Sequence, residues 1–369
     1  MDKTITETIG VDLGDRYSVY CTVDQASGEE HQIGRLATKP AAFEAFFRQH
    51  PRARVVLEVG THSAWASRIA SAHCAEMYVA NARELHFIFK NKRKSDVVDA
   101  EALARVGRLD PQLLHPIRHR GEGAQRDLTL IRARAALMSA RTDLVNSLRG
   151  LVKAFGARLP KQDAASLRYR TREHLPEALK GALTPMLLAI EFLSDEIARY
   201  DKEVERLSAA SYPETACLRQ VHGVGSLTAL AYVLTLEDPG HFARSRDVGP
   251  YLGLVPKRDQ SGETDKQLRI TKEGDALLRT LLVQCAQRLL QETSPDSDLK
   301  RHGERIASQG GKIAMRKAVT GVARKLSVLL HALWKTGEVY NPNMRSCAAS
   351  APPRPQRFGT GGPIHPESG

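Results

Sequence analysis

The chain has 369 residues, and its 54 lysines and arginines outnumber its 42 aspartates and glutamates, which gives a formal net charge of +12. A chain of this length can form two or three domains with separate hydrophobic cores. The positive charge indicates a polyanionic partner and favours nucleic acid over an anionic membrane surface. No long apolar run predicts a membrane span, and the N-terminal MDKTITETIGVDLG lacks the apolar core of a signal peptide.

The cysteines are scattered, odd in number and without any C-x-x-C pair. This pattern is typical of reduced thiols in a cytoplasm and argues against a zinc site or a disulfide framework. The tail at 343–369 is rich in Pro, Gly, Ser and Arg, and is predicted to be disordered. The five cysteines are Cys21, Cys74, Cys217, Cys285 and Cys347.

The first part of the chain, residues 1–115, alternates predicted strands with predicted helices. The apolar run ARVVLEVG indicates a buried strand, whereas WASRIASAHC has the period of a helix. This order indicates an α/β domain with a mixed sheet. The predicted strands are 5–14, 17–24, 31–38, 53–60 and 76–82, and the predicted helices are 43–50, 65–74 and 94–108.

From about residue 121 the apolar residues recur at steps of three and four, which is typical of long heptad-patterned helices. An antiparallel helical hairpin, a coiled-coil dimer arm and a plain helical bundle all fit this pattern. Residues 116–211 are therefore predicted as a helical connector, and a third, mostly helical domain follows at 212–342. The apolar positions of the first long helix are Leu128, Ile131, Ala135, Met138 and Val145, and those of the second are Ile190, Leu193, Ile197, Val204 and Leu207.

Four acidic residues of the first domain are candidates for one shared site. Asp12 ends the apolar strand of IGVDLG, and Glu58 ends that of VVLEVG. A carboxylate in an apolar strand is costly unless it is paired or binds a metal. Asp96 and Asp99 are one helical turn apart, so they lie on one face of the predicted helix. Carboxylates gathered in this way hold two Mg²⁺ ions for phosphoryl transfer.

Each of these acids also has a purely structural interpretation. Asp12 fits a turn, Glu58 fits a strand-end ion pair, and the aspartate pair fits a helix start capped by Ser95. IGVDLG also fits the first phosphate loop of sugar kinases and actin-like ATPases, but the second phosphate loop that those proteins need is missing here. The order strand-acid, strand-acid, helix-acid-acid instead resembles the ribonuclease H-like fold of Holliday-junction resolvases.

A basic run precedes the paired aspartates. We expect its cations to hold backbone phosphates close to the metal ions, although ordinary surface charge also explains Lys92 and Arg93. The run consists of Lys90, Lys92, Arg93 and Lys94.

A serine in a polar segment of the third domain is a candidate nucleophile. Ser261 lies in KRDQSGETDKQLRITK, which is predicted to be a flexible loop. A hydroxyl close to metal ions or cations can attack a phosphodiester and hold a DNA end covalently, whereas a Ser-Gly pair in a loop also fits a simple turn. Asp259 and Glu263 would repel a phosphate unless neighbouring cations offset them. The candidate nucleic-acid-binding cations are Lys266, Arg269 and Lys272, with Arg258 beside them.

HGVGSLTALAYVL has the pattern of a helix-hairpin-helix element, with Gly223 and Gly225 in the turn. Glycines at such a turn let backbone N–H groups approach a phosphate at the start of the next helix. A glycine-rich turn between two helices is the structural alternative. Ser226 and Ser245 are alternative serines, and both are better explained as helix caps or solvent-facing residues.

Taken together, these motifs closely resemble the DEDD-type transposases of bacterial insertion sequences, the family of the insertion sequence numbered one hundred and ten, which is related to the Piv DNA invertases. The resemblance spans nearly the whole chain, from IGVDLG to KAVTGVARKLSVLLHALWKTGEVY. Its most specific part is GLVPKRDQSGETDKQLRITKEGDALLRTLLVQCA.

The resemblance implies a RuvC-like, ribonuclease H-like α/β domain at 1–115, a coiled-coil connector at 116–211 and a mostly helical serine domain with a helix-hairpin-helix element at 212–342. It implies that two Mg²⁺ ions are bound by Asp12, Glu58, Asp96 and Asp99, and that Ser261 attacks DNA to form a phosphoserine intermediate. It further implies donor and target DNA, a structured guide (bridge) RNA, a bacterial cytoplasmic location and a homo-oligomer, either dimer or tetramer, whose composite sites join domains of two protomers.

Two other functions fit the same residues. A RuvC-like metal-dependent nuclease would hydrolyse DNA with water, and Ser261 would then be structural. A non-catalytic nucleic-acid-binding protein would use the glycine hairpin and the basic helices, and would not need Asp12. A covalent protein–DNA adduct distinguishes the recombinase from both.

Overall fold

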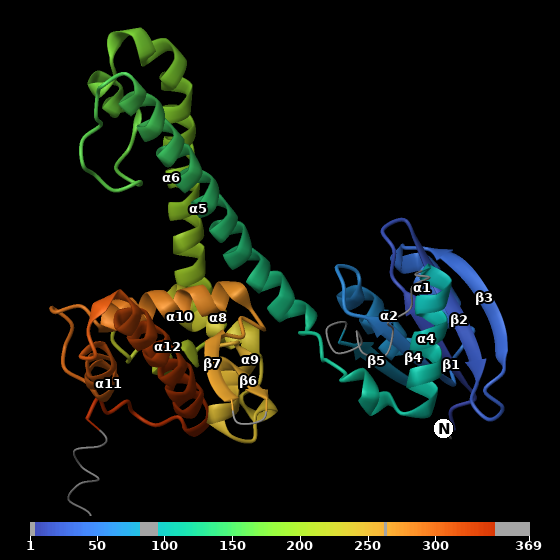
Figure 1. Ribbon diagram of the computed structural model, residues 1–369. Coiled ribbons are helices and arrows are strands. Elements are labelled where there is room, and N and C mark those ends of the chain that lie inside the picture. The colour runs from blue at the N-terminus through green and yellow to red at the C-terminus, as the bar shows by residue number, and fades with distance from the viewer. Residues whose placement is uncertain (1–3, 82–94, 262–263, 344–369) are drawn as a thin grey trace, which may run out of the picture. The chain divides into compact units, whose positions relative to one another are not determined.

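The computed structural model describes residues 4–81, 95–261 and 264–343, and of residues 169, 259–261 and 264–267 it describes the backbone alone. The basic run at 90–94 and almost all of the predicted disordered tail therefore lie outside the described residues. The chain divides into two compact units, Met1–Gly121 and Glu122–Gly369 (Figure 1). The first is a mixed α/β unit and the second is mostly helical.

The first unit is built on one mixed five-stranded sheet in the order β3-β2-β1-β4-β5. The first three strands pair antiparallel, as consecutive hairpin strands do, while β4 and β5 continue the sheet parallel to β1. The strands predicted from the sequence are confirmed. They are β1 (Glu7–Asp12), β2 (Tyr17–Asp24), β3 (Glu30–Ala37), β4 (Ala53–Glu58) and β5 (Glu76–Ala80).

Helices cover both faces of this sheet. One face packs on α1 and α2, whose Phe43, Phe47 and Ala70 join Ile9 and Val55 in one buried cluster. The other face packs on α4. The helices of this unit are α1 (Pro40–Phe47), α2 (Ser63–His73), α4 (Asp96–Leu109) and the short 3₁₀ helix η1 (Pro111–Leu114).

The contact between α4 and β1 is unusually close because Gly10 has no side chain. A Cβ at Gly10 would lie 2.1 Å from the carbonyl oxygen of Ala100 and 2.5 Å from the amide nitrogen of Ala104. Gly107 provides the same clearance further along α4, where a Cβ would lie 2.4 Å from a methyl group of Val56. At Gly10 the backbone of the helix therefore lies directly on the backbone of β1.

The second unit begins with two long helices, α5 (Glu122–Ala154) and α6 (Glu177–Ala210), which pack against each other (Figure 1). Arg134 Nε lies 2.6 Å from Asp201 Oδ1, and Arg141 Nη1 donates to Ser194 Oγ over 3.2 Å. From the first contact to the second, the residue number rises along α5 and falls along α6. The two helices are therefore antiparallel. The predicted long helices are confirmed, and this polar layer separates a buried cluster at each end of the pair.

The core of the second unit surrounds α8 (Ser226–Leu236), which is buried along almost its whole length. A helix that is apolar all round is typical of the centre of a helical domain. None of the helices in the described ranges is long and apolar enough to cross a membrane. The other helices are α7 (Thr215–Leu218), α9 (Val248–Tyr251), α10 (Ala276–Leu289), α11 (Asp298–Ala307), α12 (Gly311–Thr336), η2 (Tyr169–His174), η3 (Pro239–His241) and η4 (Ser245–Asp247).

One sequence prediction for this unit is wrong. The polar segment around residue 261 was expected to be a flexible loop, but it forms an antiparallel hairpin of β6 (Pro256–Ser261) and β7 (Thr264–Ile270). The strand propensity of this segment is low because its residues are mostly charged and polar.

A buried histidine fixes one side of the helical core. His331 on α12 is fully buried, and its two ring nitrogens lie 2.9 Å from Ser245 Oγ and 3.0 Å from the carbonyl oxygen of Pro239. A carbonyl only accepts, so Nε2 donates to Pro239 and Nδ1 accepts from the Ser245 hydroxyl. Burial lowers the pKa of His331 below its usual 6.5, and the nearby Lys335 ammonium lowers that pKa further. The folded protein therefore favours the neutral ring.

Gly10→Ala should destabilise the first unit, because the added methyl group must push α4 away from β1. We expect a loss of about 1–3 kcal/mol or more in the free energy of unfolding, as for other overpacked cores. Gly60→Ala is the matched control, since a Cβ there would meet nothing within 4 Å. Denaturant unfolding of both variants measures the difference, and equal stability would contradict the close contact.

His331 should make the second unit less stable in mild acid. The unfolded chain protonates this ring near pH 6.5, while the folded chain resists protonation because its pKa is lowered. Below pH 6.5 the unfolded state therefore binds more protons, so stability is complete above that pH and falls as the pH drops below it. In His331→Asn this fall should be smaller, whereas a change at the exposed His222 should leave it intact. Thermal unfolding between pH 5 and 8 tests this.

Candidate active site

The carboxyl ends of β1 and β4 place two of the four acids next to each other. These strands are parallel neighbours, and their register pairs Gly10 with Val56 and Val11 with Leu57. Continuing this register by one residue sets Asp12 beside Glu58 at the same edge of the sheet. Both side chains are partly buried, and both take part in polar contacts.

Strand alternation directs both carboxylates toward the α4 face. Ile9 and Val11 pack with α1 and α2, so Gly10 and Asp12 belong to the opposite face. On β4 the guanidinium of Arg54 reaches the carbonyl oxygen of Gly107 on α4, over 2.9 Å. Val56 and Glu58 share that face with Arg54, because alternate residues of a strand point the same way.

The start of α4 lies at this edge. Ala100 contacts Gly10, whereas Gly107, further along α4, contacts Thr8 near the start of β1. The helix therefore runs opposite to β1, and its N-terminus lies toward the end of the strand that carries Asp12. Ser95 caps the helix and accepts from the Val98 amide over 3.3 Å, as the sequence predicted. Asp96 and Asp99 follow in the first turn.

The four acids share one edge but do not form a closed metal site. Among the described residues, no three His, Cys, Asp or Glu side chains are close enough together to hold a metal ion. Asp96 is exposed, and Asp99, Asp12 and Glu58 are partly exposed, so all four can be reached from solvent. As a donor set they are hard carboxylate oxygens on three elements, the chemistry that Mg²⁺ requires.

Sequence reasoning missed a histidine that fixes the loop after Glu58. The Ser63 hydroxyl donates to the carbonyl oxygen of Gly60 over 2.7 Å, and its oxygen lies 2.8 Å from His119 Nε2. Burial lowers the pKa of His119, as do the nearby cations Arg68 and Arg120. This neutral histidine therefore holds the turn that follows β4, and no spacing in the sequence links it to Ser63.

The candidate nucleophile Ser261 is the last residue of β6 and pairs with Thr264 across the hairpin. Its side chain is not described, and Gly262 and Glu263 lie outside the described residues. The register sets Asp259 opposite Lys266. Lys266 is therefore the register partner of one of the two acidic residues that flank the serine in the sequence.

The segment just before β6 and the segment just after β7 form the root of this hairpin. Each makes a tight turn, and the two turns cross in close contact. A Cβ at Gly274, which has a φ of +74°, would lie 2.0 Å from the carbonyl oxygen of Tyr251. A Cβ at Gly253 would lie 2.3 Å from the backbone of Glu273. The predicted phosphate contact Lys272 lies in this crossing, is exposed, and has a φ of +60° that is uncommon without glycine.

A single arginine joins the two turns. Nη1 of Arg279 on α10 donates to the carbonyl oxygens of Leu252, over 3.0 Å, and Glu273, over 2.8 Å. These carbonyls come from the segments before β6 and after β7, so Arg279 holds both ends of the hairpin. Sequence reasoning missed this residue, because an arginine on a helix gives no sign of a backbone partner.

The glycine turn before α8 has the shape of the predicted hairpin between two helices. Gly223 has a φ of +83°, and Gly225 is exposed at the start of α8 with open space beside it. Ser226 is the first residue of α8 and does not cap it, because the N-cap position is Gly225 and no side chain caps this helix. Ser245 does not serve as a solvent-facing residue, because its hydroxyl bonds to the buried His331.

The chain is similar in sequence to known transposases. Residues 9–156, which hold all four acids, match a transposase family model of the DEDD type, and residues 215–302 match the model of the transposase IS116/IS110/IS902 family. The transposase for insertion sequence element IS1328 of Yersinia enterocolitica is 30% identical over 257 residues, which is 69% of this chain and 75% of the relative. The transposase for IS1111A of Coxiella burnetii is 29% identical over 262 residues, or 68% of this chain and 70% of the relative.

A probable family 20 transposase of Pseudomonas aeruginosa is 26% identical over 299 residues, which is 79% of this chain and 86% of the relative. The similarity therefore covers both the sheet unit and the helical unit. The chain belongs to the IS110 family of transposases.

Arg279→Ala should loosen the hairpin that carries Ser261. Loss of a charged donor to two carbonyls should cost about 1.5–3 kcal/mol, and the effect should be local. Hydrogen exchange should become faster at Thr271 and Lys272, whose amides bond to Val255 and Gly253. Arg288→Ala, which removes an exposed arginine from the same helix, should leave these amides unchanged. Equal exchange in both variants would rule out the proposed role of Arg279.

Proposed function

We propose that this protein is the RNA-guided DNA recombinase of an insertion sequence, which cuts and rejoins donor and target DNA. The observation that carries the proposal is the shared edge of Asp12, Glu58 and the first turn of α4, on a chain that belongs to a transposase family. Membership of that family supports DNA as the substrate. The net charge of +12 suits a protein that binds both DNA and RNA.

The acidic edge is proposed as the metal centre. Asp12, Glu58, Asp96 and Asp99 would hold two Mg²⁺ ions, and their carboxylates, drawn from three elements, fit hard cations. When bound, these ions polarise the phosphate and stabilise the charge that develops on the attacking and leaving oxygens. The protein's own contribution is to hold the carboxylates at the end of the sheet and at the start of α4. The Ser63–His119 contact fixes the turn that follows Glu58.

Ser261 is proposed as the nucleophile. Its oxygen would form a bond to phosphorus while the bond between phosphorus and a sugar oxygen breaks, and the serine proton would end on the released sugar hydroxyl. A hydroxyl from another strand would then attack the phosphoserine, rejoin the DNA and release the serine. Lys257, Arg258 and Arg269 are exposed on the hairpin and support this role, because their charges offset those of the acidic residues in the same segment.

Other groups are proposed as nucleic-acid contacts. The amides around Gly223 and Gly225 would approach backbone phosphates at the start of α8, and Lys266, Arg269 and Lys272 would do so at the serine hairpin. The RuvC-like fold, the coiled-coil role of α5 and α6, the guide RNA, the homo-oligomer and the bacterial cytoplasmic location belong to the same proposal. They are supported by the resemblance to the family.

An adduct assay tests the proposal. The protein is co-expressed with the RNA that flanks its element, given labelled donor and target DNA with Mg²⁺, and analysed on denaturing gels. We expect a covalent protein–DNA adduct that is absent from Ser261→Ala. In Asp12→Asn it should fall by more than the roughly 10–100-fold that loss of an outer-shell partner costs at metal sites.

Ser226→Ala and Asp143→Asn are matched controls, because the first removes a serine at a helix start and the second an exposed carboxylate on α5. Both should form the adduct normally. Cleavage without an adduct that survives Ser261→Ala but not Asp12→Asn would instead identify a nuclease that uses water. Full activity in Asp12→Asn would exclude the acidic edge from the chemistry.

A further inference from the structure

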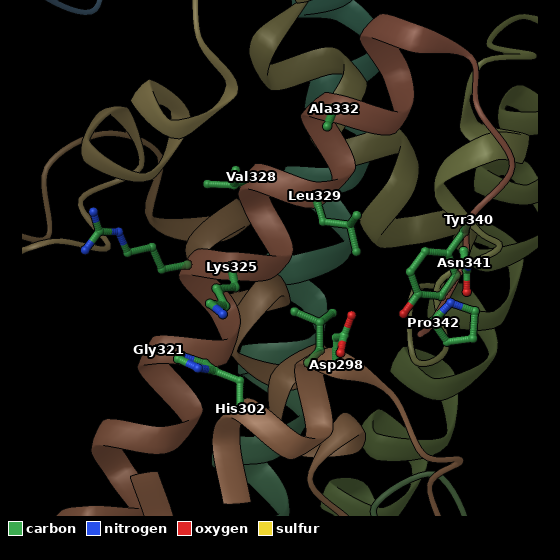
Figure 2. Close-up of a pocket in the computed structure, with 12 residues that line it drawn as sticks. Asp298, His302, Gly321, Lys325, Val328, Leu329, Ala332, Tyr340, Asn341 and Pro342 are labelled. Carbon is green, nitrogen blue, oxygen red and sulfur yellow. The ribbon is translucent and has the colours of Figure 1, made fainter. Parts of the chain in front are cut away.

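A cavity of about 630 Å³ lies in the helical unit, beside α12 (Figure 2). Residues from one face of α12, the start of α11 and the chain that follows α12 line it. Figure 2 shows Lys325, Val328 and Leu329 on one side and Tyr340 and Pro342 on the other. None of the residues proposed above for the chemistry contributes to it.

The walls of this cavity are mostly apolar. Val328, Leu329 and Ala332 line it from α12, Leu299 lines it from α11, and Pro342 lies opposite. Gly321 on the same helix face also lines the cavity, and a Cβ there would lie 3.1 Å from Cδ1 of Ile306. A lining of this kind offers aliphatic contacts to an apolar ligand group.

Three hydrogen bonds hold the far wall in place. The Asp298 amide donates to the carbonyl oxygen of Pro342 over 2.8 Å, and the Tyr340 amide donates to Gln220 Oε1 over 2.9 Å. Arg301 bonds to Asn343 Oδ1 over 2.8 Å. Because the wall is fixed at three points, the cavity is preformed and costs little ordering on binding.

The rim of the cavity carries mainly positive charge. Arg324 and Lys325 line it, and Lys317 extends the same helix face one turn toward the N-terminus of α12. The only acid in the lining is Asp298, and Arg301 Nη2 lies 2.9 Å from its carboxylate. An anionic group is therefore favoured above an apolar interior.

We propose that this cavity binds one unpaired nucleobase, with the neighbouring phosphates of its strand held by Lys325, Arg324 and Lys317. A nucleobase has flat apolar faces that suit the aliphatic walls and Tyr340, and a polar edge that Asn341 and His302 can meet. Apolar or aromatic contact with splayed bases, beside a cationic path for the backbone, is how proteins bind single strands. The inference rests on the proposed function only in assuming a nucleic-acid partner.

Binding without metal tests this inference separately from the chemistry. Affinities are measured in EDTA for labelled dT₁₀, U₁₀ and a decamer of abasic sites with the same charge. The base-containing strands should bind the full-length protein more tightly than the abasic strand. Ala332→Phe fills the cavity without changing charge, and it should weaken the base-containing strands by about 5- to 150-fold, the effect of losing one stacked base, while leaving the abasic strand unchanged.

Ile313→Phe is the control, because it adds the same ring at an exposed position of the same helix. It should bind all three strands like the wild type. A larger effect on U₁₀ would assign RNA as the source of the base, and a larger effect on dT₁₀ would assign DNA. Unchanged or equally weakened binding of all strands by Ala332→Phe would overturn the proposal, whatever the adduct assay shows.

A second measurement does not depend on a variant. Oligonucleotides that carry 5-iodouracil are crosslinked to the wild-type protein, and the adducts are mapped by mass spectrometry. The proposal expects adducts in the peptides that hold residues 298–302, 324–332 or 340–342. Crosslinks confined to other peptides would contradict it.

Discussion

The backbone of α4 rests on the backbone of β1 at Gly10, and the acidic edge depends on this contact. A helix at the usual distance from a sheet would be separated from it by a layer of side chains. Here the carbonyl oxygen of Ala100 occupies the space that a Cβ of Gly10 would need. The helix start is therefore fixed to the strand end, and Asp96 and Asp99 come to the edge that holds Asp12 and Glu58.

This edge is negatively charged, although the protein as a whole is basic. Four carboxylates repel each other, and they would also repel the phosphates of a nucleic acid. Within the described residues they are not drawn into a closed cluster. In the proposed function, divalent cations bound by these carboxylates make the local charge positive. The edge then attracts DNA, whereas without the ions it repels DNA. The acids and the basic surfaces then serve one substrate.

The sequence predicts the elements whose pattern is local and misses the contacts that are not. The strands of the first unit, α4 with its Ser95 cap and the long helices follow from apolar period and capping chemistry. The hairpin β6–β7 was missed because its polar residues have no strand pattern, and its root depends on Arg279. The contact between Ser63 and His119 spans 56 residues, so no local pattern could reveal it.

The two parts of the proposed chemistry are supported in different ways. The acids stand on a sheet edge and a helix start, which are held along their whole length by packing. The serine ends a six-residue strand, and at about 3.3 Å per residue it lies roughly 20 Å from the root of its hairpin. A small rotation at the root is therefore a large displacement at Ser261. Catalytic groups need positions held to about 0.5 Å, so Arg279 and the crossed glycine turns matter to the serine although they lie far from it.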